Sequence, residues 1–461
     1  MMFKVFNHWI RWRSLAQMLF DFSFVIVGIV IAMMWVHSGL PVDHKQVLLF
    51  AVLLAASMLA INAWLGFYRR LGNRTPMETR ARAVLSLYVA VPVAYGIYAL
   101  LPLTGISREF AQLSAMSAMF GMLITRVTAT QASTAGILTR RIMVYGIGQR
   151  ALAVKEALNK SDLSAEIIGF FPAPCETHPA VPSDAVIIPN RSLTNTALAL
   201  KADEIVVALT ERRGGAMPLQ ELLDCKLQGI RVLDLASHFE QTLGQIRLES
   251  LYAGWLIFGD GFGQGALRTL VKRVFDIVCA TALILLTLPI MLITALAIVI
   301  ENGLPVFYCQ ERVGLNGRLF KVIKFRSMRR DAEKDGKPVW ASKHDDRVTR
   351  VGKIIRKLRI DELPQLLNVL KGDMSLVGPR PERPFFVDQL TREIPFYAVR
   401  HSVKPGVTGW AQVRYHYGST VEDSAEKLQY DLYYVKNHSL FLDILVLFET
   451  VGVVLTGKGA Q

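Results

Sequence analysis

Two adjacent carboxylic acids, Asp361 and Glu362, lie among arginines in the stretch from Arg356 to Pro381. An ionised carboxylate can attack phosphorus as a nucleophile, and a guanidinium group matches phosphate oxygens better than an ammonium group does. Acids and arginines in this pattern therefore indicate phosphoryl chemistry on an anionic substrate. Taken alone the signal is weak, because adjacent acids at the start of a helix are more often favourable capping charges.

The same stretch ends in a rigid corner, Pro379-Arg380-Pro381. Each proline restricts its own φ angle, and Pro381 also restricts the backbone of Arg380. We therefore expect the corner to hold the Arg380 side chain at a fixed angle, as the recognition of a phosphate requires.

Helices are expected to position the acids. Apolar residues recur at helical spacing just before them, at Val351, Ile354, Ile355 and Leu358. A second helix is predicted to start at Asp361, to tolerate Pro364 in its first turn and to end at Lys371-Gly372. The dipole of that helix would keep both carboxylates ionised.

Four apolar segments open the chain. They cover Gln17–Val36, Val47–Phe67, Ala83–Leu103 and Phe110–Ala129. The first three have the roughly 20 apolar residues that a membrane span needs, whereas Arg126 weakens the fourth. Arginines crowd the second loop and both ends of this block, so the positive-inside rule predicts that both ends are cytoplasmic.

Residues 138–250 change to short β-rich runs that alternate with helical ones, which is typical of a parallel α/β sheet. The candidate strands are Arg141–Tyr145, Glu166–Phe171, Ala185–Ile188, Glu204–Leu209 and Arg231–Leu233.

The first of these strands leads into Gly146 and Gly148, a turn close to the one that seats a pyrophosphate at a helix N-terminus. The second strand ends in Gly169–Pro174, without the acid that usually holds a ribose. Two interpretations stay open. Either the domain binds a nucleotide, or it is a regulatory or dimerisation module whose glycines only make a tight turn.

A further apolar segment, Ile277–Ile300, carries no charge and is long enough to span a membrane. Pro289 interrupts it and is expected to kink the helix. Basic residues flank the segment on both sides, and a crossing helix would leave one basic cluster outside, against the charge rule. The sequence therefore predicts a broken helix over residues 274–300 that enters and leaves by the cytoplasmic face.

From Lys272 onward, a series of short motifs follows without a large gap. They are Lys272–Asp276, Gln310–Gly314, Phe320–Met328, Asp361–Gln365, Leu367–Pro381, Lys404–Gln412 and Asp431–Asn437. In this order they resemble the bacterial sugar transferase family, the polyprenyl-phosphate hexose-1-phosphate transferases. The whole architecture is similar to the long members that start exopolysaccharide assembly, and Leu455–Ala460 resembles the exosortase-associated subgroup.

The resemblance implies that a sugar 1-phosphate moves from a UDP-sugar to undecaprenyl phosphate, with release of UMP. It implies that Asp361 is the nucleophile of a covalent aspartyl-phosphosugar intermediate, with Glu362 beside it. Because both substrates are anionic, Mg²⁺ is expected at these two acids, with Mn²⁺ as an alternative.

The resemblance also implies that Arg356 and Arg380 contact phosphate. Lys324 and Arg326 are further candidates for binding phosphate or substrate, and contact with lipid headgroups is the alternative for both. The loop at Lys404–Gly406 lies either near the nucleotide or in a structural turn.

The composition agrees with a membrane protein that does not bind nucleic acid. Hydrophobic residues make up 52% of the chain, and the net charge is +14. Such an excess reflects arginines on the cytoplasmic side of a membrane, and no nucleic-acid-binding motif is present. The four cysteines form no CxxC pair, so neither a metal site nor a disulfide is expected from them.

The predicted fold is a membrane α-helical bundle of four spans (1–135), a Rossmann-like α/β middle domain of the nucleotide- or CoA-binding kind (136–255) and a mainly α catalytic domain with a re-entrant helix (256–461). The middle and catalytic domains are expected on the cytoplasmic face of a bacterial inner membrane. The expected partners are the bilayer, the UDP-sugar, undecaprenyl phosphate, downstream glycosyltransferases and a second copy in a homodimer. The alternatives are a glycosyltransferase that releases UDP, or a catalytically silent scaffold with a nucleotide-sensing domain.

Overall fold

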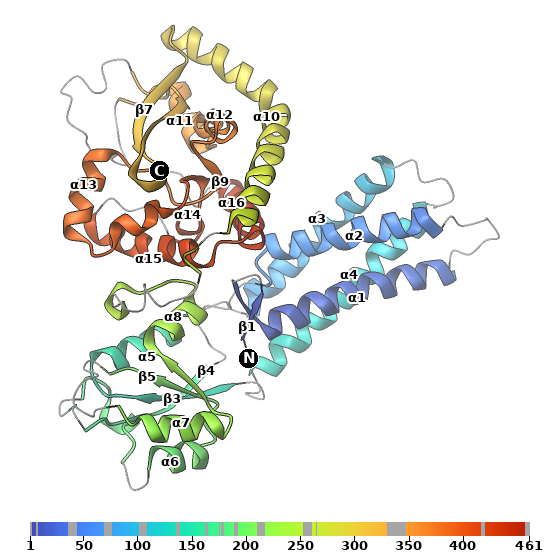
Figure 1. Cartoon of the computed structure of the whole chain (residues 1–461). Helices are drawn as coiled ribbons and strands as arrows, with labels where there is room; N and C mark the ends of the chain where they lie inside the picture. The colour runs from blue at the N-terminus through green and yellow to red at the C-terminus, as the bar shows by residue number, and fades with distance from the viewer. Residues whose placement is uncertain are drawn as a thin grey trace. The chain divides into compact units, whose positions relative to one another are not determined.

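The computed structural model resolves the chain into two compact units, one of Met1–Phe3 and Ile10–Leu243 and one of Lys4–Trp9 and Gly244–Gln461 (Figure 1). The residues that it describes are 2–5, 8–35, 44–68, 76–100, 108–134, 139–161, 165–174, 176, 179–188, 192–209, 217–251, 261–263, 265–329, 347–415 and 420–456.

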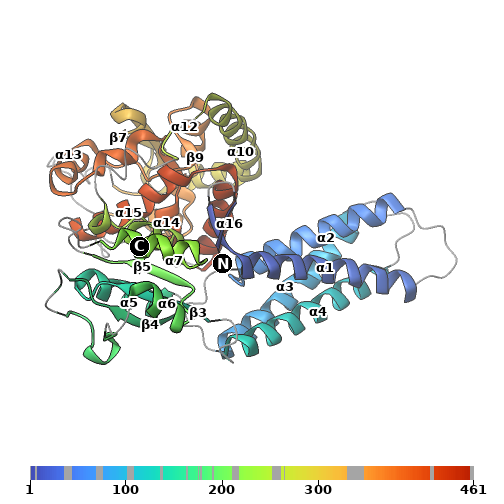
Figure 2. The same ribbon diagram turned by 60° about the horizontal axis from the view of Figure 1, so that its bottom comes forward.

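Four long helices follow two short strands at the start of the chain and lie side by side in Figures 1 and 2. The elements are β1 (Met2–Val5), β2 (His8–Arg11), α1 (Trp12–Trp35), α2 (His44–Trp64), α3 (Pro76–Leu100) and α4 (Arg108–Thr134). Helix α1 packs on α2 and α4, and α3 packs on the same two helices. Each helix overlaps one of the four apolar segments predicted from the sequence.

Within the described residues, three helices are long and apolar enough to cross a membrane. They are Ser14–Trp35, Lys45–Ala63 and Ala266–Asn302. The first two belong to the bundle, and in α3 only the shorter stretch Val84–Ala99 is apolar. Of the arginines in the second loop that predict the orientation, Arg69, Arg70 and Arg74 lie outside the described residues, whereas Arg80 and Arg82 lie in α3.

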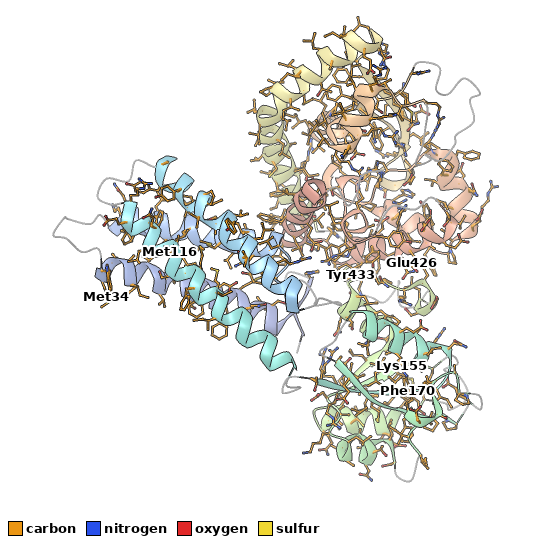
Figure 3. The ribbon with its side chains drawn as sticks, turned by 180° about the vertical axis from the view of Figure 1, so that it is seen from behind. Met34, Met116, Lys155, Phe170, Glu426 and Tyr433 are labelled. Atoms are coloured by element: carbon orange, nitrogen blue, oxygen red, sulfur yellow. The ribbon has the colours of Figure 1, made fainter. Side chains whose placement is uncertain are left out.

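Helices α1 and α4 approach each other closely at Gly28, which faces Ser114, Ser117 and Ala118. A Cβ added at Gly28 would lie 2.9 Å from the backbone nitrogen of Ala118, so only glycine fits there. Large apolar side chains instead face outward, as Figure 3 shows for Met34 and Met116, which are 80% and 63% exposed. An apolar exterior, with close helix contact at small residues, is expected of a bundle in lipid.

The middle part of the chain forms a four-stranded, fully parallel sheet in the order β4-β3-β5-β6. The strands are β3 (Arg140–Tyr145), β4 (Ala165–Phe171), β5 (Glu204–Val207) and β6 (Arg231–Asp234). The parallel sheet predicted from the sequence is thus confirmed. The strand predicted at Ala185–Ile188 is wrong, because that region contains only one bridge, from Val186 to Phe170, after the 3₁₀ turn η1 (Ser183–Ala185).

Helices cover both faces of this sheet, with α5 and α8 on one face and α6 and α7 on the other in Figure 1. Their bounds are α5 (Gln149–Ser161), α6 (Leu193–Ala199), α7 (Leu219–Leu227) and α8 (Leu235–Leu243). Strand β3 alternates between the two layers. Ile142 and Val144 pack in the α5 and α8 layer, whereas Met143 and Tyr145 pack in the other.

The second unit is mainly helical. Its elements are η2 (Leu248–Ser250), α10 (Ala266–Asn302), β7 (Phe307–Val313), η3 (Leu315–Gly317), β8 (Leu319–Phe325), α11 (Arg350–Lys357), η4 (Ile360–Glu362), α12 (Gln365–Lys371), β9 (Ser375–Val377), α13 (Pro384–Glu393), η5 (Tyr397–Ser402), β10 (Gly406–Thr408), α14 (Trp410–Arg414), α15 (Val421–Asn437) and α16 (Leu440–Thr456). Strands β7 and β8 form an antiparallel hairpin, and β9 pairs in parallel with β10.

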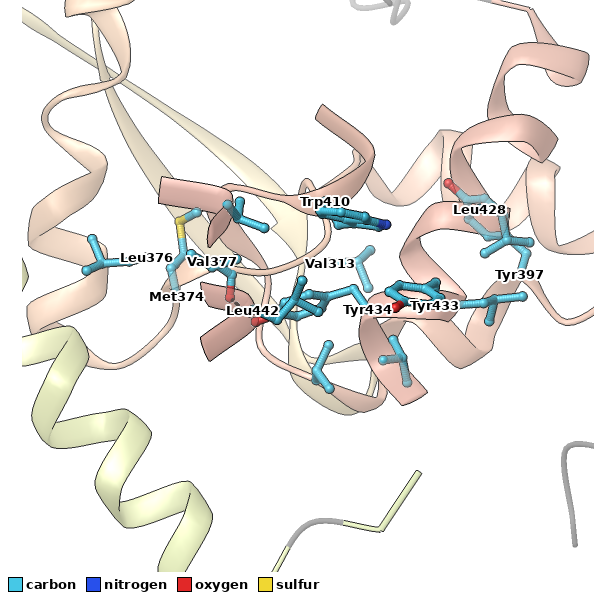
Figure 4. Close-up of a cluster of buried hydrophobic side chains, with 14 of the residues drawn as sticks. Val313, Met374, Leu376, Val377, Tyr397, Trp410, Leu428, Tyr433, Tyr434 and Leu442 are labelled. Carbon is cyan, nitrogen blue, oxygen red and sulfur yellow. Dashed lines mark hydrogen bonds between the residues drawn. The ribbon is translucent and has the colours of Figure 1, made fainter. Parts of the chain in front are cut away.

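The core of this unit gathers aromatic side chains from α14 and α15 (Figure 4). Trp410 stacks on Tyr433 with ring centroids 5.8 Å apart, and the Tyr434 hydroxyl donates a hydrogen bond to Asp443. Helix α16 turns its two acids inward, because Asp443 pairs with Lys272 at 2.7 Å and Glu449 with Arg414 at 2.8 Å. These two ion pairs fix α16 to the core of the unit.

Candidate active site

The acid pair lies in a 3₁₀ turn between two helices. Helix α11 ends at Lys357, Arg359 takes a left-handed conformation with φ of 58°, and Ile360–Glu362 then form η4. The α-helix α12 begins only at Gln365, with Pro364 as its N-cap. The helix predicted to start at Asp361 therefore starts later, because the reversal at Arg359 and the missing amide hydrogen of Pro364 favour 3₁₀ bonds over this stretch. Ionisation of the acids must then depend on nearby side chains rather than on a helix dipole.

Glu362 is the centre of a cluster of three cations. Its Oε1 lies 2.8 Å from Nη2 of Arg380, 3.3 Å from Nζ of Lys324 and 3.5 Å from Nη1 of Arg359. Burial opposes ionisation of Glu362, but the charges of Arg380, Lys324 and Arg359 outweigh it, so the pKa of this carboxyl is well below its usual range. Glu362 is therefore a permanent anion at neutral pH.

Asp361 has the opposite environment. Its Oδ1 is buried and accepts no hydrogen bond from the described residues. Burial and the adjacent Glu362 charge raise the pKa of Asp361, against the opposing charges of Lys324, Arg380 and Arg359. Two neighbouring carboxyl groups whose pKa values are pushed apart are typical of acids with different roles in catalysis.

The corner around Arg380 is held through its backbone, so its side chain is left for the acid pair. Three successive carbonyl oxygens accept hydrogen bonds: that of Pro379 from the Gly406 amide at 3.0 Å, that of Arg380 from Arg400 at 2.9 Å and that of Pro381 from Arg312 at 3.1 Å. The rigidity predicted from the two prolines thus has a second source in these tertiary hydrogen bonds.

Two of the sequence motifs meet at this corner by direct backbone contact. A Cβ added at Gly378 would lie 2.3 Å from the carbonyl oxygen of Lys404, and one at Gly409 would lie 2.2 Å from the carbonyl oxygen of Gly378. No other residue fits at either position without moving the backbone. The glycines of Leu367–Pro381 and Lys404–Gln412 therefore serve the parallel pairing of β9 with β10.

Lys324 reaches Glu362 because β8 is tied to α12. The Asn368 side chain accepts a hydrogen bond from the Ile323 amide at 3.0 Å and donates one to the Lys321 carbonyl at 2.7 Å. Burial lowers the pKa of Lys324, and the charge of Glu362 opposes this shift. The structure thus brings together Asp361, Glu362, Lys324 and Arg380.

Arg326 and Arg356 are placed differently. The Nη2 of Arg326 donates to the carbonyl oxygens of Asn302 and Gly303, at the end of α10. Arg326 is thus buried at the end of α10, whereas Lys324 lies at the acid pair. Arg356 lies in the last turn of α11, and its guanidinium group has no ion-pair partner in the described part of the chain, so it is free to meet an anion.

Charged residues at the start of α10 bind the end of α12 and strand β9, the elements that follow the acid pair in the sequence. Arg273 donates to the carbonyl oxygens of Val369 and Leu370, which end α12. Asp276, which is buried, accepts hydrogen bonds from the Ser375 hydroxyl at 3.1 Å and the Leu376 amide at 3.2 Å. The Lys272–Asp276 motif therefore anchors the long apolar helix to the end of α12 and to β9.

The far end of α10 returns to the same unit. Glu301 accepts hydrogen bonds from the amides of Arg350 and Val351, at 2.8 and 3.0 Å, and Ile298 packs against Phe325. Helix α10 contains Pro289 and bends along its length in Figure 1, as predicted.

The glycine turn of the middle domain holds a carboxylate of the chain itself. The Oε2 of Glu176 accepts hydrogen bonds from the amides of Ile147 and Gly148, at 2.5 and 3.1 Å. These are the amides that would face a phosphate in a dinucleotide site. Glu176 is thus an acid that follows the second strand, but it binds the amides of the glycine turn itself. Binding of a nucleotide there stays a prediction.

Sequence reasoning missed Arg359, Arg400 and Asn368 as parts of the site. Arg359 stands next to the acids in the sequence, but only its left-handed backbone directs it to Glu362. Arg400 and Asn368 act across packed elements, so no local pattern identifies them.

The described residues contain no group of three or more histidine, cysteine or acidic side chains able to hold a metal ion. One buried, unpartnered carboxylate oxygen at Asp361 fits a cation that takes its other ligands from phosphates and water, as Mg²⁺ usually does. The Oε1 of Glu362 already faces three cations and fits less well.

A family model described as bacterial sugar transferase matches residues 267–457. A protein of Aeromonas hydrophila, named UDP-N-acetylgalactosamine-undecaprenyl-phosphate N-acetylgalactosaminephosphotransferase, is 44% identical over 263 residues. That match covers 57% of this chain and 61% of the Aeromonas protein, less than two thirds of its length.

Two proteins named UDP-glucose:undecaprenyl-phosphate glucose-1-phosphate transferase are also similar. The one from Xanthomonas campestris pv. campestris is 30% identical over 408 residues, which is 83% of each chain. The one from Caulobacter vibrioides is 46% identical over 192 residues, covering 41% of this chain and 71% of that protein. The likeness to the Xanthomonas protein thus extends well beyond the segment that the family model matches.

Proposed function

Because the chain belongs to the bacterial sugar transferase family, we propose that it transfers a sugar 1-phosphate from a UDP-sugar to undecaprenyl phosphate and releases UMP. This reaction would start the assembly of an exopolysaccharide or another glycan. The names of the similar proteins support a nucleotide-activated sugar and a lipid phosphate as the two substrates. Those names differ in the sugar, so the donor is proposed only as a UDP-hexose or UDP-N-acetylhexosamine.

The observation that carries the proposal is the contrast between the two acids. Glu362 is neutralised by Arg380, Lys324 and Arg359, whereas Asp361 presents a buried oxygen without a partner. A carboxylate with a raised pKa is a better nucleophile, once ionised, than an ordinary one. Asp361 is therefore the better candidate for covalent chemistry, and Glu362 for organising the cations around it.

In the proposed first step an oxygen of Asp361 forms a bond to the sugar-bearing phosphorus, and the bond from that phosphorus to UMP breaks. The electron pair leaves with UMP, and an aspartyl-phosphosugar remains. In the second step an oxygen of undecaprenyl phosphate attacks the same phosphorus and restores the Asp361 carboxylate. Two steps at one residue allow a soluble donor and a lipid acceptor to use one site in turn.

Positive charge at the site would stabilise the transferring phosphoryl group, since this chemistry depends mainly on position and electrostatics. Arg380 is held by its backbone and its side chain is directed at Glu362, so its guanidinium group lies at the acid pair, where it would face a substrate phosphate. Arg356, without an ion-pair partner in the described residues, is the second candidate. Mg²⁺ at Asp361 would add a hard cation that neutralises phosphate oxygens when bound.

For the membrane we propose four N-terminal spans, a Rossmann-like middle domain on the cytoplasmic face and a re-entrant α10. Re-entry is supported by the contacts of α10, because Asp276 near its start and Glu301 near its end bind neighbouring parts of one compact unit. The segment from Arg350 to Leu376 that carries both sets of partners contains only short helices, turns and the start of β9. A helix that crossed the bilayer would separate these partners.

The test is an assay of nucleotide release with purified protein in detergent, undecaprenyl phosphate, Mg²⁺ and a panel of UDP-sugars. Release of UMP together with a lipid-linked sugar diphosphate is expected for at least one donor. Release of UDP would instead support a glycosyltransferase that moves only the sugar. No turnover of any donor, with a properly folded protein, would favour a catalytically silent scaffold.

A further inference from the structure

Arg400 is a buried cation that touches the corner but not the acids. It lies in η5, is 6% exposed and uses both terminal nitrogens. Its Nη2 donates to the carbonyl oxygen of Arg380 at 2.9 Å and lies 2.8 Å from Oδ2 of Asp431. Its Nη1 donates to the Tyr397 hydroxyl at 2.6 Å.

These contacts form a continuous chain from helix α15 to the acid pair. Asp431 of α15 holds Arg400, Arg400 holds the backbone of Arg380, and the side chain of Arg380 pairs with Glu362. Asp431 is 2% exposed, so both ends of the Arg400–Asp431 pair are shielded from water. A buried ion pair of this kind is weak evidence for stability but a strong constraint on geometry.

We propose that Arg400 is a positioning residue that sets the direction of the Arg380 side chain toward Glu362 and the substrate phosphate. The role in substrate binding rests on the proposed function, whereas the role in placing Arg380 does not. The prolines on either side of Arg380 limit its φ and ψ angles but leave the corner free to move as a body. Hydrogen bonds at the carbonyls of Pro379 and Pro381 hold the two sides of the corner, and the hydrogen bond from Arg400 fixes the carbonyl of Arg380 itself.

The chemistry of the pocket explains why the residue is arginine. A guanidinium group offers several donors in one plane, and here three acceptors lie around it: a carboxylate, a phenol oxygen and a carbonyl oxygen. A lysine ammonium could keep the charge opposite Asp431 but could not span the same three acceptors. Arg400→Lys is therefore the conservative variant, and Arg400→Gln is the severe one.

A kinetic cycle tests the proposal on the full chain. Arg400→Gln is expected to lower kcat for UMP release at least tenfold in the wild-type background and less than twofold in the Arg380→Ala background, where no side chain remains to be positioned. Arg400→Lys should recover part of the loss. An equal fold-loss in both backgrounds would indicate a general structural role and would overturn the proposal.

A second cycle does not depend on activity. The melting temperatures of Glu362→Gln, Arg380→Ala and the double variant measure the coupling between these two side chains, expected to be on the order of 2 °C. The coupling should disappear in the Arg400→Gln background, and its persistence would overturn the proposal. If no donor yields UMP the proposed function fails, but this cycle still decides the role of Arg400.

Two further variants keep the tests interpretable. If Arg400→Gln does not fold, Tyr397→Phe removes only the hydroxyl that accepts from Arg400 and should weaken the coupling in part. Arg414→Gln breaks a comparable pair, Arg414–Glu449 at 2.8 Å, that does not touch the corner. This control is expected to lower the melting temperature and to leave both the kcat and the coupling unchanged.

Discussion

The Nη2 of Arg380 lies 2.8 Å from the Oε1 of Glu362, and this ion pair joins the proline corner directly to the acid pair. Eighteen residues separate the two in sequence, and they belong to different elements of the fold. The contact gives Glu362 a fixed negative charge and gives Arg380 a fixed direction.

The two acids should respond differently to neutralisation. Asp361→Asn removes the proposed nucleophile and is expected to lower UMP release by about a thousandfold or more. Glu362→Gln should also reduce turnover, but with a loss of melting temperature as well, because three cations would face a neutral partner. Trapping of radiolabelled sugar phosphate on wild-type protein, and its absence in Asp361→Asn, would identify the acceptor. Turnover of Asp361→Asn within a few fold of wild type would exclude Asp361 as the nucleophile.

The two arginines proposed to bind phosphate should differ in how much their loss destabilises the fold. Arg356→Ala removes a side chain without an ion-pair partner in the described residues, so it should lower kcat/KM with little change in melting temperature. Arg380→Ala should lower kcat by about 100-fold, as loss of a charge-stabilising donor does, and should also destabilise the protein. Steady-state kinetics and thermal unfolding of both variants provide the comparison. An Arg356→Ala enzyme with unchanged kinetics would remove Arg356 from the site.

Substitution of Arg326 should mainly lower stability, whereas substitution of Lys324, two residues earlier, should mainly lower kcat. Arg326→Gln leaves the carbonyl oxygens of Asn302 and Gly303 without their donor, at a cost of about 1–3 kcal/mol, while the folded fraction keeps most of its activity. Lys324→Met removes a cation from Glu362 and should reduce kcat about tenfold or more. Thermal unfolding and UMP release, measured on the same preparations, distinguish the two effects. A large loss of kcat in a stable Arg326→Gln protein would show that Arg326 acts on the substrate.

Single cysteines should report the path of α10 through the bilayer. Leu267 lies in the first turn of α10 and Leu304 just beyond its end, and they are 75% and 64% exposed, whereas Leu286, at 75% exposed, lies within its apolar length. In a background without the native cysteines, Leu267→Cys and Leu304→Cys should react with an impermeant maleimide only from the cytoplasmic side. Leu286→Cys, placed in lipid, is the control that should not react. Labelling of Leu304→Cys from outside would establish a crossing helix.

His401 should contribute a pH-dependent part of the stability. Burial, assisted by the charge of Arg400, lowers the pKa of His401 to about 4 from its ordinary 6.5. Between these values the unfolded chain binds a proton that the folded chain does not, so stability falls as the pH drops from 6.5 to 4. His401→Asn should flatten this fall by about 2 °C or more in melting temperature.

The nearby Asp431 acts in the opposite sense, because burial raises its pKa to about 6, against the opposing charge of Arg400. Its contribution to stability is largest at low pH and is lost as the pH rises toward 6. The comparison of His401→Asn with wild type cancels this contribution, since Asp431 is present in both. Identical pH profiles for the two proteins would show that His401 has the same pKa in the folded and unfolded chains.

Local patterns in the sequence determined the long helices and most strands of the parallel sheet, although they also predicted a strand at Ala185–Ile188 that the structure lacks. Apolar length predicted the helices of the bundle and α10, and β-rich runs alternating with helical ones predicted the parallel sheet. The ordered motifs after Lys272 were sufficient to indicate the family. Each of these signals comes from residues that are close in sequence, and local backbone geometry depends on those neighbours.

Tertiary structure alone decided which charges meet. The sequence predicted that a helix dipole keeps Glu362 ionised, but three cations do so, two of them from distant elements. It grouped Arg326 with Lys324, but packing placed Arg326 on the end of α10. Arg400 and Glu176 gained roles through contacts that no spacing indicates. A salt bridge forms where folded elements bring two side chains within about 4 Å, and that distance is set by the packing of the whole unit.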